Sequence, residues 1–107
     1  MKMVAVGTYS DEGKAALADS TYDNRRVAMD TLLGSMGGKV IDYFFCDGDN
    51  DFVIVADVPS REVGIGARNN AYATGSLHDM VIWFEIDLAK LTAHQRSARK
   101  VFKPITE

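Results

Sequence analysis

Four residues carry side chains that suit the binding of an aromatic molecule, namely Tyr9, Tyr43, His78 and Trp83. Each of these side chains combines an aromatic ring with at least one polar atom, so it can line a pocket and still offer a hydrogen bond. His78 is the only histidine close to the predicted sheet, and an imidazole exchanges protons near neutral pH. The alternative interpretation is that His78 is a surface residue at the head of a strand.

Asp51 is the other candidate for proton transfer, because it lies where a turn meets a predicted strand. A carboxylate there could act as a general base, or it could cap the turn by accepting backbone N–H groups. Neither His78 nor His94 has the spacing of a metal site, and Asp47 and Asp49 lack that of an EF-hand. We therefore expect no metal and no cofactor.

Three polar residues at the end of a glycine-bearing predicted helix, Arg68, Asn69 and Asn70, could hold an anionic group. They suit a solvent-facing helix surface equally well. Cys46 is the only cysteine, so no disulfide can form within the chain, and we interpret it as a small apolar strand residue. No nucleophile triad, phosphate loop or dinucleotide fingerprint is present.

The element that must position these groups is a predicted β-hairpin over residues 37–58, with its turn at 47–50. With Cys46 and Asp51 flanking the turn, both faces of the hairpin carry mostly apolar residues. The expected opposite pairs on one face are Phe44 with Val53, Asp42 with Val55 and Val40 with Asp57, and on the other face Phe45 with Phe52, Tyr43 with Ile54 and Ile41 with Ala56. Both faces must therefore be covered.

Around this hairpin, hydrophobic periodicity and capping residues predict strands over 3–9 and 80–86. Helices are expected at 12–18, from Ser20 to Met36, and over 61–72. This βαββαβ order predicts an α+β, ferredoxin-like fold with a four-stranded antiparallel sheet and both helices on one face. We expect the glycines of the third helix, Gly64 and Gly66, to allow close packing on the sheet.

The sheet face away from the helices should then be apolar, with Val40, Phe44, Val53, Val55, Val81 and Trp83 on it, or with the residues opposite to these if the two faces are exchanged. Such a patch exceeds what soluble monomers usually expose. We therefore expect a homodimer or a higher homo-oligomer, packed sheet on sheet.

Charge divides the chain into a domain at 1–88 and a helical tail at 89–107. The first has seven basic and fourteen acidic residues, a net charge of −7, and the tail has five basic residues and one acidic residue, a net charge of +4. The acidic body would repel phosphates, so we expect no nucleic-acid partner, and we expect the tail to pack on its own domain or a neighbouring subunit. No membrane span or leader is evident, which predicts a cytoplasmic protein.

Several separated segments resemble the GYD-domain family, small proteins of the dimeric α/β-barrel superfamily. They are 7–13 (GTYSDEG), 37–43 (GGKVIDY), 48–53 (GDNDFV) and 73–76 (ATGS), within a similarity that covers about residues 4–86. The name-giving Gly-x-Tyr-Asp motif is here Gly48-Asp49-Asn50-Asp51, with Asn50 in place of tyrosine. A turn role would survive this change, because Asn suits turns.

Three functions follow as hypotheses. In the first, an oligomeric module binds a small apolar or aromatic metabolite, with Tyr9, Tyr43 or His78 reaching into a pocket between sheet and helices. In the second, a cofactor-independent monooxygenase or isomerase uses His78 or Asp51 for proton transfer, as the superfamily resemblance implies. In the third, the oligomer surface is itself the function of a structural or regulatory protein.

Overall fold

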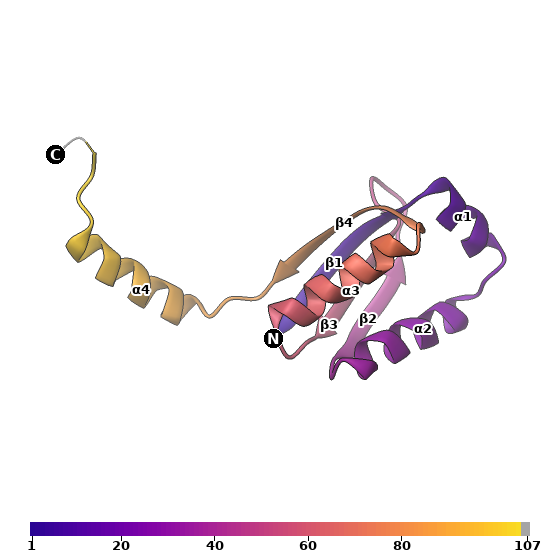
Figure 1. Ribbon diagram of the computed structural model, residues 1–107, viewed down its shortest axis with the longest axis horizontal. Helices are drawn as coiled ribbons and strands as arrows, with labels where there is room; N and C mark the ends of the chain where they lie inside the picture. The colour runs from indigo at the N-terminus through magenta and orange to yellow at the C-terminus, as the bar shows by residue number, and fades with distance from the viewer. Residues whose placement is uncertain (106–107) are drawn as a thin grey trace.

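The computed structural model, which describes residues 1–105, contains one four-stranded antiparallel sheet with helices on one face and a C-terminal helix apart from it (Figure 1). The strand order is β2-β3-β1-β4. The elements, in chain order, are β1 (Lys2–Tyr9), α1 (Asp11–Ala18), α2 (Tyr22–Ser35), β2 (Lys39–Phe45), β3 (Phe52–Asp57), α3 (Arg61–Ala73), β4 (Leu77–Phe84) and α4 (Leu88–Val101). The predicted ferredoxin-like fold with a C-terminal helix is confirmed.

The helices begin at hydroxyl-bearing residues, because these can satisfy backbone N–H groups of the first turn. Ser10 accepts from the Gly13 N–H, and Ser60 accepts from the Val63 N–H. The second helix begins one residue later than expected, with Thr21 as its N-cap. The Ser20 N–H instead bonds to the Leu17 carbonyl at the end of α1.

The hairpin register agrees with the prediction from Asp42 to Phe45 and departs from it beyond that point. Val40 lies opposite Ala56 rather than Asp57, because the register shifts between Val40 and Asp42. The expected pairing of Ile41 with Ala56 is therefore wrong as well. The irregularity returns Val40 to the helix-facing side of the sheet, where it is 4% exposed, and leaves Ile41 half exposed.

The helix-facing side of the sheet carries the core, and the opposite side, the open face, is bare in the single chain. Core side chains include Met3, Ala5, Tyr43, Ile54 and Ala56. On the open face, strand pairing aligns residues in two neighbouring rows, Phe44-Val53-Val6-Val81 and Asp42-Val55-Val4-Trp83. Apart from Val40, which is buried, the predicted apolar residues lie on this face.

Gly64 and Gly66 have different surroundings in α3. A Cβ at Gly64 would lie 2.7 Å from the Met3 sulfur and 2.8 Å from the Phe84 ring, so this glycine does permit close packing on the sheet. A Cβ at Gly66 would meet nothing within 4 Å.

The C-terminal helix, α4, stands away from the sheet (Figure 1). It begins after Asp87, which accepts from the Lys90 N–H. Its apolar residues Leu88, Leu91 and Val101 are exposed. The last strand spans Leu77–Phe84, so it starts and ends earlier in the chain than the predicted 80–86. No helix in residues 1–105 is long and apolar enough to cross a membrane.

Candidate functional site

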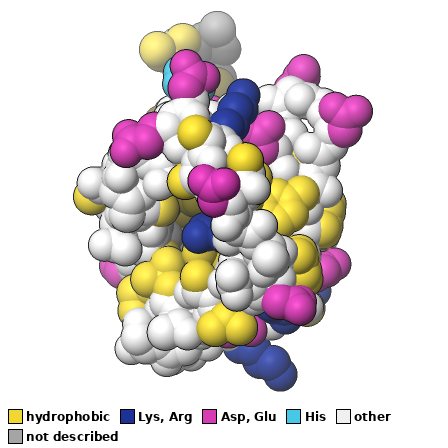
Figure 2. Space-filling view, turned by 90° about the vertical axis from the view of Figure 1, so that its right-hand side faces the viewer, with side chains coloured by type: hydrophobic (Ala, Val, Ile, Leu, Met, Phe, Trp, Pro, Cys, Tyr) yellow, Lys and Arg dark blue, Asp and Glu magenta, His cyan; other side chains and the backbone are white. Residues whose placement is uncertain are grey.

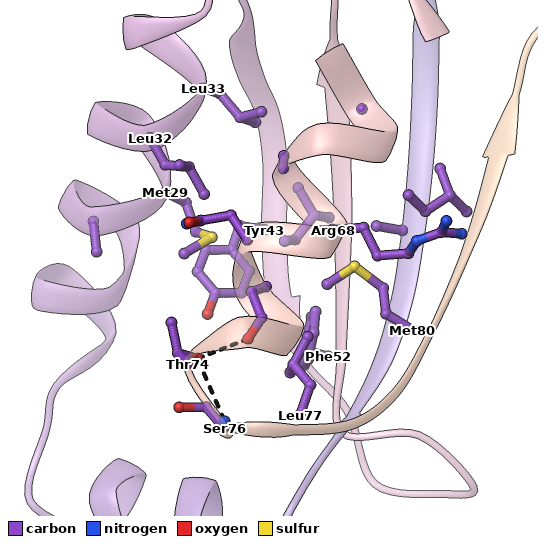
Figure 3. Close-up of a pocket in the computed structure, with 18 of the residues that line it drawn as sticks. Met29, Leu32, Leu33, Tyr43, Phe52, Arg68, Thr74, Ser76, Leu77 and Met80 are labelled. Carbon is purple, nitrogen blue, oxygen red and sulfur yellow. Dashed lines mark hydrogen bonds between the residues drawn. The ribbon is translucent and has the colours of Figure 1, made fainter. Parts of the chain in front are cut away.

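A cavity of about 340 Å³ lies between the sheet and the two long helices (Figure 3). It forms because α2 packs along β2 and α3 packs along β4, which leaves the central strands β3 and β1 beneath a gap. Figure 3 shows Met29, Leu32 and Leu33 on α2, and Tyr43 and Phe52 on the sheet. The surface of the cavity is mostly apolar.

A second hollow of about 150 Å³ lies beside the cavity on the side of α1. The two spaces share Tyr9, Arg25 and Ser76 in their linings. Figure 2, viewed from the side of α1 and α2, shows a recess with hydrophobic side chains around it and Lys or Arg side-chain atoms within it. A small molecule can therefore enter between α1, α2 and the start of β4.

Two tyrosine hydroxyls meet inside the cavity. The hydroxyl oxygens of Tyr9 and Tyr43 lie 3.4 Å apart, and either can donate to the other. Burial raises the pKa of Tyr9 well above its ordinary value, the hydrogen bond with Tyr43 raises it further, and the nearby Arg25 guanidinium opposes these effects. Each tyrosine has one hydroxyl hydrogen. One of the two forms the hydrogen bond between Tyr9 and Tyr43, so the other is free to donate to a ligand.

This raised pKa predicts a specific alkaline instability. Above pH about 10 an unfolded chain releases the Tyr9 proton while the native state keeps it, so the free energy of unfolding falls as pH rises. A Tyr9→Phe variant lacks this contribution. Above pH 10 the free energy of unfolding of the wild type should therefore fall relative to that of the variant. The decrease should be smaller than about 1.4 kcal/mol per pH unit, which is the limit for one proton. Urea unfolding at stepped pH values measures it, and parallel curves would contradict the assignment.

Two arginines line the cavity, Arg25 from α2 and Arg68 from α3. Sequence reasoning singled out Arg68 and missed Arg25. A usable signal was present, since Arg25 has Tyr22, Ala28 and Met29 as its helical neighbours and no acidic residue three or four positions away. A basic residue on an apolar helix face is a marker of an inward-facing charge.

The predicted site residues do not all gather at the cavity. Tyr9 and Tyr43 line it, whereas His78 and Trp83 do not. His78 is exposed on β4, and Trp83 is 58% exposed on the open face.

Asp51 also lies outside the cavity lining, in the turn between β2 and β3. Its carboxylate accepts from the Tyr9 N–H at 2.9 Å, and its own N–H donates to the Gly7 carbonyl. Asn50 accepts from the Thr8 hydroxyl at 3.3 Å. These contacts fasten the turn to the end of β1 and so fix the position of Tyr9.

The segments that meet here, Gly7–Tyr9 and the turn at 48–51, are those that resembled a known family. A family model described as GYD domain matches residues 3–87. The chain belongs to the GYD-domain family. No curated protein matches it. In this GYD domain Asn50 occupies the position of the motif tyrosine and retains a role in the turn. Residues 1–105 contain no group of three or more His, Cys, Asp or Glu placed to hold a metal ion.

Proposed function

We propose that this GYD-domain protein binds a small, largely apolar or aromatic metabolite between its sheet and α2 and α3. The observation that carries the proposal is the cavity of about 340 Å³, which falls at the lower end of the usual range for ligand pockets. A void of this size lined by Met, Leu, Ile and Phe costs packing energy unless something occupies it.

The polar groups of the cavity favour binding with a defined orientation. They are few and lie among apolar walls, which is the usual composition of a small-molecule site. The Tyr9–Tyr43 pair provides a directed hydroxyl, and Thr74 and Ser76 lie at the rim. His78 and Asp51 do not reach this space, so no observation favours the monooxygenase or isomerase alternative over simple binding.

The proposal includes a two-fold homodimer, in a cytoplasmic location, that packs the open faces of two sheets together. Trp83 is 58% exposed, and Phe44 and Val81 are each 43% exposed. Side chains of this size are each worth about 1.5–3 kcal/mol when buried. A second copy presents the same apolar rows, so the contact is self-complementary.

A neutral fluorescent probe, N-phenyl-1-naphthylamine, tests the binding site. The wild-type protein should enhance its emission saturably, because the probe leaves water for an apolar cavity. Ala71→Trp places an indole in the cavity and should weaken binding by about tenfold or more, since every 1.4 kcal/mol of lost contact is tenfold.

The matched control is Ala73→Trp, in the same helix but outside the cavity lining, which should bind as the wild type does. Equal affinities of the wild type and Ala71→Trp would place the probe elsewhere on the protein and reject the cavity as the site.

A further inference from the structure

The cavity lining is positively charged although the domain around it is acidic. Residues 1–88 contain fourteen acidic and seven basic residues. Within the described chain none of those fourteen lines the cavity, whereas Arg25 and Arg68 both do. A cavity with two cations and no anion, in a body of the opposite net charge, is selective for a negatively charged occupant.

These arginines are not committed to the protein's own carboxylates. In residues 1–105 the ion pairs are Met1 with Asp57 and Arg26 with Asp30, and neither involves a cavity residue. The Nε atoms of Arg25 and Arg68 are both buried and have no hydrogen-bond partner among the residues that the structure describes. A buried guanidinium nitrogen in this state carries an uncompensated desolvation cost, which a bound oxyanion would relieve.

The two guanidinium groups have different surroundings. Arg25 is close enough to Tyr9 to act on its titration, and it lines both the main cavity and the entrance hollow. Arg68 extends from α3 toward β4 (Figure 3). Donors therefore converge at the Arg25 end, where a guanidinium fork lies near the hydroxyl pair of Tyr9 and Tyr43.

We propose that the ligand is an apolar organic acid whose oxyanion pairs with Arg25 at the entrance. Its apolar part then lies against Met29, Leu32 and Phe52, and Arg68 adds to the positive potential. This inference rests on the proposed function and narrows it, because the cavity would bind a neutral aromatic molecule less well than the corresponding acid.

The test uses two probes of nearly the same shape, 2-naphthoate and 2-naphthamide, which differ in charge. Each is titrated near neutral pH and low salt to displace N-phenyl-1-naphthylamine. The wild type should bind the carboxylate about tenfold or more tightly than the amide, a typical effect for a charge-assisted hydrogen bond. High salt should reduce this ratio without changing the affinity for the amide.

Arg25→Gln should remove most of the preference for the carboxylate and leave only the smaller contribution of Arg68, and it should weaken binding of the amide much less than binding of the carboxylate. The matched control is Arg26→Gln, in the same helix turn, because Arg26 pairs with Asp30 outside the cavity. It should retain the wild-type ratio. If Arg25→Gln does not fold, Arg25→Lys keeps the charge and loses the planar fork, so it should retain part of the preference.

The two proposals fail in different ways. If N-phenyl-1-naphthylamine does not bind the wild type, the proposed function itself is rejected. If it binds but the carboxylate and the amide displace it equally, the cavity function stands and the acid-binding inference is overturned. A carboxylate preference as large in Arg25→Gln as in the wild type overturns the assignment of Arg25 as the anchor.

Discussion

Trp83→Lys should leave the protein monomeric at micromolar concentrations at which, in the proposed sheet-on-sheet pairing, we expect the wild-type chain to be dimeric. Trp83 ends the open-face row that also holds Val55 and Val4, and it is 58% exposed in the single chain. A two-fold interface contains every substitution twice, so the variant loses two indole contacts and buries two ammonium groups. A loss of roughly 3 kcal/mol or more weakens the dimer by about a hundredfold or more.

Sedimentation equilibrium measures the mass against the 11.7 kDa of one chain. Trp83 is the only tryptophan, so its emission should also shift to longer wavelength as the wild type is diluted and the interface opens. Val27→Lys is the matched control, because Val27 is 63% exposed on α2, away from the sheet. It should remain dimeric. A wild type that sediments as a single chain throughout would reject sheet-on-sheet pairing.

Gly13→Ala should destabilise the fold more than any other glycine-to-alanine change in the helices. Gly13 is buried in α1, and a Cβ there would overlap the carbonyl oxygen of Ser76. That oxygen accepts from the Ser10 N–H at 2.9 Å, and the Ser10 hydroxyl donates to the Gly75 carbonyl at 2.7 Å. The helix backbone fixes the position of the Cβ, and the Ser76 oxygen belongs to the backbone, so neither atom can rotate away from the other.

Forcing α1 off the start of β4 should cost about 3 kcal/mol, the upper end for overpacking, and lower the melting temperature by roughly 10 °C or more. Gly66→Ala is the control, since it lies exposed inside α3 with open space around its Cα. It should stabilise the protein by up to about 1 kcal/mol through helix propensity. Thermal and urea unfolding give both values. If both variants unfolded together with the wild type, the close contact at Ser76 would be refuted.

Much of the fold was predictable because its signals are local. Ser10 and Ser60 cap helices through hydrogen bonds that span three residues, and Gly37 ends α2 in a left-handed conformation that glycine adopts most easily. Strand alternation likewise placed Tyr43 and Phe44 on opposite faces, and in the structure Tyr43 is buried on the helix side while Phe44 is exposed on the open side. Interactions of this kind depend on residue type and spacing alone.

The hairpin irregularity near Ile41 could not be predicted in the same way. Alternation placed Val40 on the open face, but the register shift places it in the core with Tyr43. A β-bulge, in which two residues of one strand lie opposite one residue of its partner, fits the same apolar pattern but reverses the face on which the residues beyond it lie. Whether the regular or the bulged register is more stable depends on how the side chains of β2 pack against α2 and β3.

The sequence by itself determined the order of elements, the two apolar sheet faces and the placement of Tyr43 and Phe44 on opposite faces. Only the tertiary structure decided that α2 and α3 diverge enough to leave a cavity, that Arg25 turns into it, and that His78 and Trp83 lie outside it. The reason is physical: periodicity and capping act over a few residues, whereas the volume between two helices depends on packing between elements far apart in the chain.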